Sequence, residues 1–366
     1  MPSFLPTPEG LKKLQAAKAR LDLSFAAIAK QAEVSADTVS RLFHPERGKR
    51  VSQRSLEAIA QVLQLALDKI VLSEQFSSKV ADNYALVKAS LEEAEKWIQW
   101  AIEKKADVLD LSNLRLVILP KSIGQVEHLT RLYLQENQLT SLPKELGKLT
   151  RLKELYLSQN KLTVIPRELG QLQNLAELYL EQNQLTTVPR ELGQLKNLIE
   201  LHLEQNQLAA VPEELGQLRN LVYLHLNQNQ LTSLPKELGK LTNLTHLYLH
   251  RNQLTSLPVE IGELDDLKVL NLSQNQLTSL PKELSNLVNL PELDLFHNKL
   301  ISIPGEFSRL VNLRELNLSQ NSLLSIPKEL GELRKLSALY LNHNQLTSVP
   351  KELSRIVELE VLYLNH

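Results

Sequence analysis

The strongest constraint on the fold of this chain is a period of 23 residues that runs from Leu109 to the last residue, His366. One copy, residues 178–200, reads LYLEQNQLTTVPRELGQLKNLIE. Its asparagine recurs in ten copies, each 23 residues from the next: Asn137, Asn160, Asn183, Asn206, Asn229, Asn252, Asn275, Asn298, Asn321 and Asn344. A fixed period of this length predicts stacked units, each of which contacts only its neighbours.

The repeated pattern, LxLxxNxLxxLPxxLgxLxxLxx, assigns a structural role to most of its positions. Leu178 and Leu180 alternate on a short strand and are expected to point inward. Asn183 follows at the turn, where its amide can bond backbone groups that would otherwise be buried and unpaired. Pro189 fixes φ where the chain crosses to the back. Steps of 23 from Leu109 reach Leu362, which predicts about twelve strands in one parallel sheet.

These leucine positions resemble the leucine-rich repeats with LPxxLxxLxxL units that occur in Roco GTPases, Scribble-type scaffolds and plant intracellular Ras-group-related proteins. The resemblance covers about 260 residues and implies an α/β leucine-rich repeat solenoid over residues 108–366. It also implies a protein partner on the concave face. The GTPase domain of Roco proteins has no counterpart here, so the resemblance implies no nucleotide chemistry.

The two ends of the solenoid pose a capping problem, because each terminal coil lacks a neighbour on one side. Residues 76–107 are expected to form a linker and an amphipathic capping helix over Asn83–Lys104, in which Leu86, Val87, Leu91, Ala94, Ile98 and Ala101 make the apolar face. At the other end the chain stops one residue before the next asparagine would fall. Truncation, an oligomer contact or fraying would each account for that edge.

The variable positions of the strands are candidates for binding a protein partner on the concave face. Tyr, His and Arg are the side chains that protein interfaces use as anchors. The candidates are Tyr133, Tyr156, Tyr179, His202, Tyr223, His225, His246, Tyr248, His250 and Arg251. Glu154, Glu177 and Glu200 lie beside them on neighbouring strands and repel one another, which favours a cationic partner surface. The alternative is that these columns record repeat duplication only.

No cofactor, metal or catalytic residue is predicted. His202 and His225 lie near Glu200 and Glu204 and could reach a metal, but nothing in the sequence fixes the orientation of the rings. No nucleophile, base and orienting group are suggested together, so an enzyme is not expected. Neither GxxxxGK[ST] nor GxGxxG occurs.

Residues 1–75 have a different pattern, which predicts a helical domain. Between Ser24 and Leu65 the apolar spacing is that of a helix-turn-helix, with a further helix on either side. Four helices in about 60 residues resemble phage-repressor (Xre-type) domains, and VSADTVSRLF is similar to the recognition segment of the lac repressor family. Glu33 departs from that family, in which glycine is usual at the turn.

If this resemblance extends to function, the helix from Ser35 to Phe43 enters the major groove of DNA. Arg41 is then the best candidate for a guanine contact, and the basic residues after the helix suit phosphates. The candidate DNA-binding residues are Ser35, Ala36, Asp37, Ser40, Arg41, Arg47, Lys49, Arg50 and Arg54. The alternative is a helical adaptor that binds no DNA. DNA binding by one such domain usually requires a dimer, so a homodimer is possible.

Charge and composition narrow the functional classes. The whole chain has a formal net charge of −1, whereas residues 1–75 contain 11 Lys and Arg against 8 Asp and Glu. The absence of cysteine, of a secretion signal and of a long apolar run favours a cytoplasmic protein with no membrane segment. The sequence therefore predicts a DNA-binding regulator whose solenoid binds a protein. A protein-interaction scaffold with a helical adaptor head is the alternative.

Overall fold

A computed structural model describes residues 3–4, 8–20, 25–32, 34, 36–43, 51–62 and 78–364. It divides into two compact units, Met1–Ala89 and Ser90–His366, and each is described by itself below. Among the described helices, none combines the length and apolar character needed to cross a membrane.

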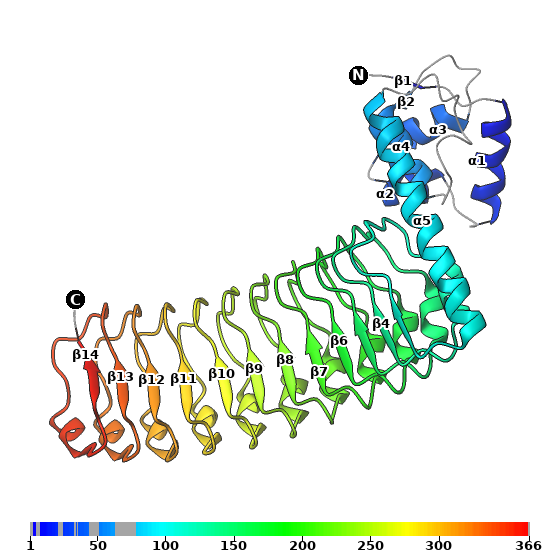
Figure 1. The fold of residues 1–366 in the computed structure, drawn as a ribbon. Helices are drawn as coiled ribbons and strands as arrows, with labels where there is room; N and C mark the ends of the chain where they lie inside the picture. Colours follow the sequence, from blue (N-terminus) through cyan, green and yellow to red (C-terminus); the bar gives the residue numbers. More distant parts are fainter. Residues whose placement is uncertain are drawn as a thin grey trace. The chain divides into compact units, whose positions relative to one another are not determined.

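The larger unit is built on one parallel sheet of twelve strands in consecutive order, as the repeat predicts (Figure 1). The register is uniform, so that Leu178 pairs with Leu201 and every strand is displaced from the last by 23 residues. The strands are β3 (Val108–Asp110), β4 (Arg131–Tyr133), β5 (Glu154–Tyr156), β6 (Glu177–Tyr179), β7 (Glu200–His202), β8 (Tyr223–His225), β9 (His246–Tyr248), β10 (Val269–Asn271), β11 (Glu292–Asp294), β12 (Glu315–Asn317), β13 (Ala338–Tyr340) and β14 (Val361–Tyr363).

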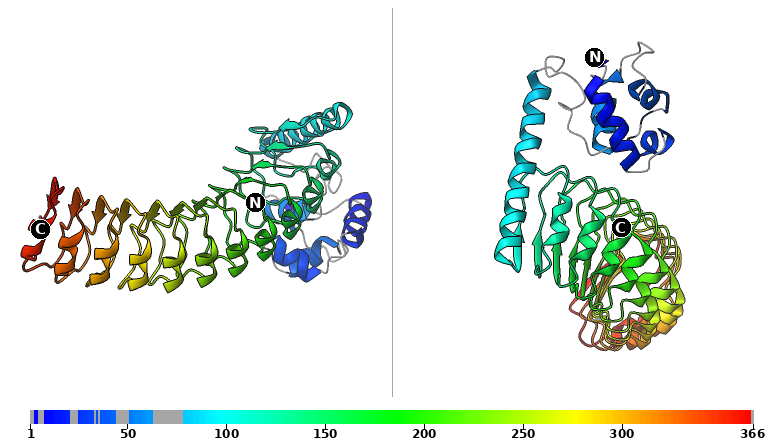
Figure 2. Two further views of the ribbon diagram at one scale, coloured as in Figure 1. Left: turned by 90° about the horizontal axis from the view of Figure 1, so that it is seen from below. Right: turned by 90° about the vertical axis from the view of Figure 1, so that its right-hand side faces the viewer.

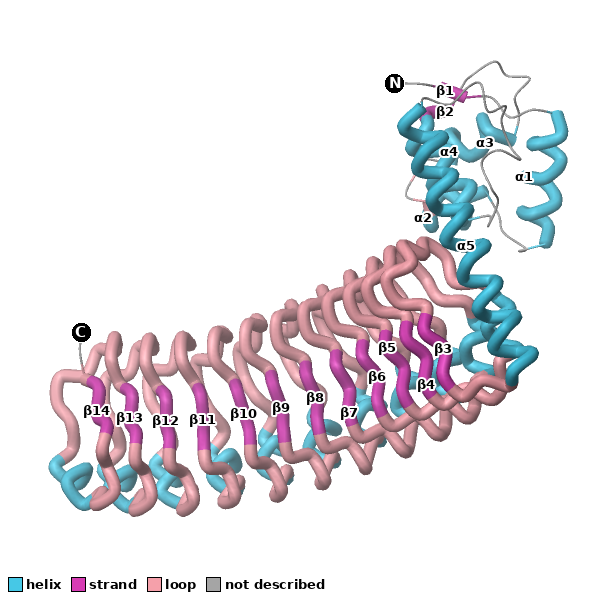
Figure 3. Tube along the Cα trace, viewed as in Figure 1, coloured by secondary structure: helices cyan, strands magenta, loops and turns pink. Residues whose placement is uncertain are grey.

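A 3₁₀ helix follows each strand but the last and lies away from the sheet in its coil (Figure 3). Proline precedes each helix, as at Pro189 with φ −68° and ψ 142°. The expected α/β solenoid thus has 3₁₀ rather than α-helices, because only five residues are helical before the next leucine turns inward. The helices are η4 (Lys121–Gln125), η5 (Lys144–Lys148), η6 (Arg167–Gln171), η7 (Arg190–Gln194), η8 (Glu213–Gln217), η9 (Lys236–Lys240), η10 (Val259–Glu263), η11 (Lys282–Asn286), η12 (Gly305–Arg309), η13 (Lys328–Glu332) and η14 (Lys351–Arg355).

One continuous apolar core fills the stack of coils. Figure 2 shows the coils themselves from two further sides. In the coil of residues 178–200, the leucines at positions 178, 180, 185, 192, 195 and 198 are all fully buried. Exposure is higher at the edge of the described sheet, where Leu362 on the edge strand β14 is 40% exposed. Burial therefore depends on the neighbouring coils, as the repeat architecture requires.

The repeated asparagines form a ladder of side-chain bonds through this core, and we call them the ladder asparagines. Asn183 donates from Nδ2 to the carbonyl oxygens of Leu157, at 2.9 Å, and Leu180, at 3.0 Å. Its Oδ1 accepts from the backbone N–H of Leu162 at 3.0 Å. Each ladder asparagine thereby satisfies an N–H and a C=O of the preceding coil as well as a C=O of its own.

A row of glycines on the opposite side of the coils allows close stacking. At Gly193 a Cβ atom would lie 2.2 Å from the backbone oxygen of Glu214 on the next coil, which is closer than any real Cβ contact. Ser285 occupies the same repeat position in a later coil and is only 1% exposed. Later coils therefore accommodate a small side chain at this position, whereas the close approach at Gly193 leaves no room for one without a shift of the backbone.

The helix α5 (Ser78–Lys104) supplies the cap at β3. Its last turns bury Ala94, Ile98 and Ala101 completely, and these residues belong to the same core as the coil leucines. Ser122 Oγ donates to Glu95 Oε2 at 2.7 Å and ties the helix to the first coil. The predicted apolar face was too long, however, because Leu86 and Leu91 are 53% and 39% exposed.

The smaller unit contains α1 (Pro8–Arg20), α2 (Phe25–Gln31), α3 (Ala36–Phe43) and α4 (Gln53–Val62). Two short strands, β1 (Ser3–Phe4) and β2 (Val51–Ser52), pair antiparallel and were not predicted. The helices share a core in which the fully buried side chains include Leu14, Ile28, Val39, Leu42 and Ile59.

We expect Asn206→Ala to lower the free energy of unfolding by about 2–5 kcal/mol, because it leaves buried backbone groups of two coils without partners. Urea denaturation provides the measurement. Asn220→Ala is the matched control, since that exposed amide makes one bond, 2.9 Å long, to the carbonyl of Lys196. Equal effects of the two substitutions would contradict the role given to the ladder.

Candidate functional site

The outer surface of β3–β14, which we call the sheet face, carries the side chains that do not point into the core. The first and last residues of each strand project there, on either side of a buried leucine in the middle, as does the residue after the second inward leucine. Nine of the ten predicted protein-binding residues are half-buried on this face, and Arg251 is exposed. Arg251 lies in the turn before Asn252, with φ 56°, rather than on a strand.

Six aromatic rings stack face to face across β4–β9, and we call them the ring stack. Their order is Tyr133, Tyr156, Tyr179, His202, His225 and Tyr248. Successive ring centroids are 4.1–4.8 Å apart, close to the spacing of neighbouring strands. Tyr223 and His246 form a second, shorter stack at 4.6 Å beside it.

Tyrosine hydroxyls in the stack donate to the glutamates at the strand starts. The Tyr179 hydroxyl lies 3.0 Å from Glu177 Oε2 and 3.1 Å from Glu200 Oε2. Burial and these carboxylates raise the pKa of Tyr179 above its usual range. A hydroxyl has one proton and serves one carboxylate at a time, so the predicted repulsion between the glutamates is reduced rather than removed.

The histidines at the centre of the stack differ in their electrostatic surroundings. Burial lowers the pKa of His202, but the hydrogen bond from Nδ1 to Glu204 Oε1, at 3.3 Å, and the nearby carboxylates outweigh it and raise the pKa overall. Burial and the proximity of His202 lower the pKa of His225 to about 4. At neutral pH His225 is therefore an uncharged imidazole with a free lone pair.

The row beside the ring stack contains buried acceptors that lack donors in the described part of the chain. They share one repeat position, two residues after the strand, and are Gln135 Oε1, Glu181 Oε2, Glu204 Oε2, Asn227 Oδ1 and, in the tautomer that accepts there, His250 Nδ1. Asn227 is only 7% exposed and was not among the predicted site residues. Its position after the second inward leucine, the same as that of Glu204, is the signal that could have identified it.

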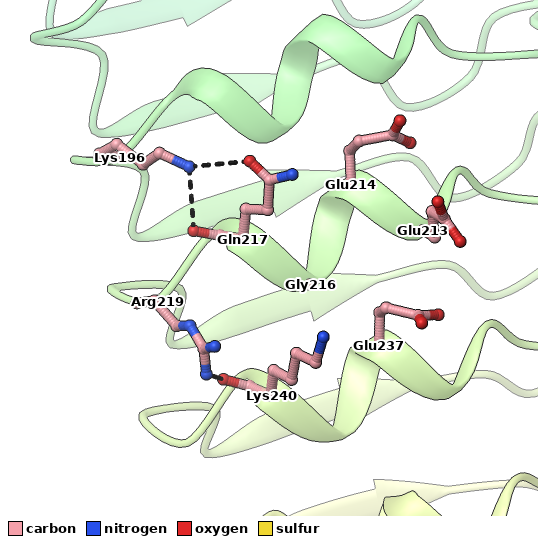
Figure 4. Close-up of a pocket in the computed structure, with 8 residues that line it drawn as sticks. All are labelled: Lys196, Glu213, Glu214, Gly216, Gln217, Arg219, Glu237 and Lys240. Atoms are coloured by element: carbon pink, nitrogen blue, oxygen red, sulfur yellow. Dashed lines mark hydrogen bonds between the residues drawn. The ribbon is translucent and has the colours of Figure 1, made fainter.

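A hollow on the helical side of the coils is a competing location for a site (Figure 4). Two of the three cations that line it bond to the coils themselves. Lys196 Nζ donates to the carbonyl oxygen of Gly193 at 2.8 Å and to Gln217 Oε1 at 3.1 Å, and Arg219 donates to the carbonyl oxygen of Lys240. These contacts brace adjacent coils, so the sheet face is the better candidate.

The predicted DNA-binding residues are only partly described. Ser35, Arg47, Lys49 and Arg50 lie outside the described residues, and of Ala36, Asp37 and Arg54 only the backbone is described, in α3 and α4. Ser40 and Arg41 are half-buried, and Arg41 Nε is fully enclosed. The contacts predicted for Ser40 and Arg41 with base edges stay a prediction.

Comparison with known proteins identifies the repeat family of the larger unit. Family profiles described as "Leucine rich repeat" and "Leucine-rich repeat region" match residues 105–162, 127–185, 150–208, 173–231 and 311–366, and residues 210–321, respectively. No curated protein gave a match.

Three solved structures illustrate the likeness. A leucine-rich repeat protein of Leptospira interrogans is 39% identical over 70% of this chain and 77% of its own, with a TM-score of 0.57. YopM from Yersinia enterocolitica is 29% identical over 75% and 59%, with a TM-score of 0.56. The plant peptide hormone receptor RGFR1, in complex with RGF2, is 31% identical over 70% of this chain and 47% of the receptor, with a TM-score of 0.58.

The stacked coils, the single parallel sheet and the half-buried ring stack on its outer face define a solenoid of the kind that presents a long binding surface. The chain belongs to the leucine-rich repeat family. Proteins of this family generally mediate protein–protein interaction.

We expect Tyr179→Phe to destabilise the solenoid by about 1 kcal/mol, because it removes the proton between Glu177 and Glu200. The loss should shrink in high salt, which screens the remaining repulsion. Denaturation at low and high salt measures it. Tyr133→Phe is the control, since no hydrogen bond of its hydroxyl occurs within the described residues. A loss that does not depend on salt would argue against a hydroxyl bridge between charges.

Proposed function

We propose that the chain is a binding protein rather than an enzyme, and that the sheet face between β4 and β9 binds an extended segment of a protein partner. The ring stack carries this proposal. It offers a row of aromatic edges, and aromatic side chains supply much of the binding energy at protein interfaces. Stacking already holds each ring in one orientation, so the side chains lose little further conformational entropy when a partner binds.

The charge of this surface indicates the chemistry of the partner. The hydroxyls of Tyr156 and Tyr179 offer only two protons to the carboxylates that line the stack over β5–β7. These five carboxylates belong to Glu154, Glu177, Glu181, Glu200 and Glu204. Lysine or arginine side chains of a partner would supply the missing donors. The similarity to a plant receptor that is solved in complex with a peptide hormone adds support for an extended ligand.

Selection of random linear peptides on the immobilised full chain, in the presence of EDTA, tests this proposal. We expect enriched peptides to contain Lys or Arg and to bind Glu177→Gln/Glu200→Gln at least ten-fold more weakly, about 1.4 kcal/mol. Glu213→Gln/Glu237→Gln, on the helical side, is the matched control. Peptides that bind all three proteins equally, or no enrichment at all, would overturn the proposal.

We also propose, for the smaller unit, a helix-turn-helix fold that binds duplex DNA. The supporting observation is the link between α2 and α3, where the N–H of Val34 donates to the carbonyl of Ala29 at 3.0 Å and the small Ala29 is buried. Such a short link between two helices suits a helix-turn-helix. The excess of Lys and Arg in residues 1–75 suits phosphates. The chain would then act as a regulator that holds a protein partner on DNA.

DNA binding by the full chain should weaken as salt rises, with a slope of about −0.9 in log K against log salt for each phosphate neutralised. Titration of labelled duplex DNA at several salt concentrations measures this slope. We expect Lys49→Ala/Arg50→Ala to reduce it, and Arg219→Ala in the solenoid to leave it unchanged. A slope near zero would favour the alternative of an adaptor unit.

A further inference from the structure

We propose that the centre of the ring stack is a metal site, in which His202, His225 and Glu204 bind a divalent transition-metal cation such as Zn²⁺. Each of the three offers one ligand atom, and these atoms lie within 4.8 Å of one another. Imidazole and carboxylate are ligands that Zn²⁺ accepts readily, and three protein ligands leave a fourth position for water or a further side chain.

Register brings these residues together. His202 and His225 are directly opposed on the parallel strands β7 and β8, with ring centroids 4.1 Å apart. Glu204 follows His202 by two residues and therefore projects from the same side of its strand. Its Oε1 lies 3.3 Å from His202 Nδ1, which holds the imidazole and the carboxylate side by side.

A second observation points to a cation at this place. Glu204 Oε2 and Asn227 Oδ1 are buried acceptors with no donor from the described residues, and Asn227 is only 7% exposed. Buried oxygen atoms without donors are costly, and a bound cation would satisfy both. Asn227 lies in the next coil at the same repeat position as Glu204, since the N–H of Gln205 donates to its carbonyl oxygen at 3.1 Å.

Binding would require small side-chain movements. Ligand atoms around a tetrahedral zinc ion are separated by about 3.4 Å, given Zn–N and Zn–O distances near 2.1 Å. The His202 and His225 rings are inclined by only 17°, and their lone pairs lie in the ring planes. One ring must therefore turn about χ2 to direct its nitrogen to the shared ion, and χ2 of histidine is a soft torsion.

Zn²⁺ titration of the chelator-treated full chain, by calorimetry and by competition with a chromogenic chelator, tests the site. We expect one equivalent to bind and the affinity to fall at least about ten-fold in His225→Asn and in Glu204→Gln, since loss of even an outer partner costs that much. His246→Asn is the matched control, because this histidine is on the adjacent strand of the same face but outside the group. Co²⁺ should give the intense visible absorption of a tetrahedral site with the wild type and with His246→Asn, but not with His225→Asn or Glu204→Gln.

Thermal unfolding separates loss of the site from loss of the fold. Zn²⁺ should raise the midpoint of the wild type and of His246→Asn, but not that of Glu204→Gln, which changes one atom and keeps the shape of the side chain. Failure to bind one equivalent, or equal binding by Glu204→Gln, would overturn the proposal. Peptide binding in EDTA is independent of this result, so the two proposals fail separately.

Discussion

A coil of 23 residues cannot satisfy its own backbone, because it has only three strand residues and a short 3₁₀ helix to pair. The ladder asparagines meet this need by bonding backbone groups of two successive coils from within the core. Everything on the surface depends on that arrangement. It fixes the offset between strands at one value along the whole sheet, and the side chains at each repeat position therefore form straight columns.

The sheet face shows how a uniform scaffold generates local chemistry. A tyrosine repeated on β4, β5 and β6 gives stacked rings and hydroxyls shared between glutamates. Replacing tyrosine by histidine on the next two strands keeps the stack but changes what it offers, from hydroxyl donors to imidazole nitrogens. The charge and donor balance thus changes over two coils while the backbone stays the same.

The periodic part of the fold was predictable because its positions repeat in sequence. The twelve strands, the buried leucines, the role of Asn183 and the place of Pro189 all follow from spacing alone. The side-chain arrangement on the sheet face did not follow. Ring stacking, the hydroxyl between Glu177 and Glu200, and the unpaired Asn227 Oδ1 depend on rotamers chosen jointly by neighbouring side chains. The burial predicted for Leu86 and Leu91 was wrong for a related reason. Helical spacing shows which residues share a face of the capping helix, but not how much of that face packs on the first coil.

The uniform offset between coils has a consequence for how such a chain can change in length. Any two coils present equivalent backbone groups to each other, so excising residues 178–200 would rejoin the ladder without a mismatch. The surface would not be conserved in the same way. Tyr156 would then stack directly on His202, and the carboxylates of Glu181 and Glu200 would disappear from the face. Gain or loss of whole repeats therefore preserves the backbone scaffold. It changes which side chains are neighbours on the sheet face, one coil at a time.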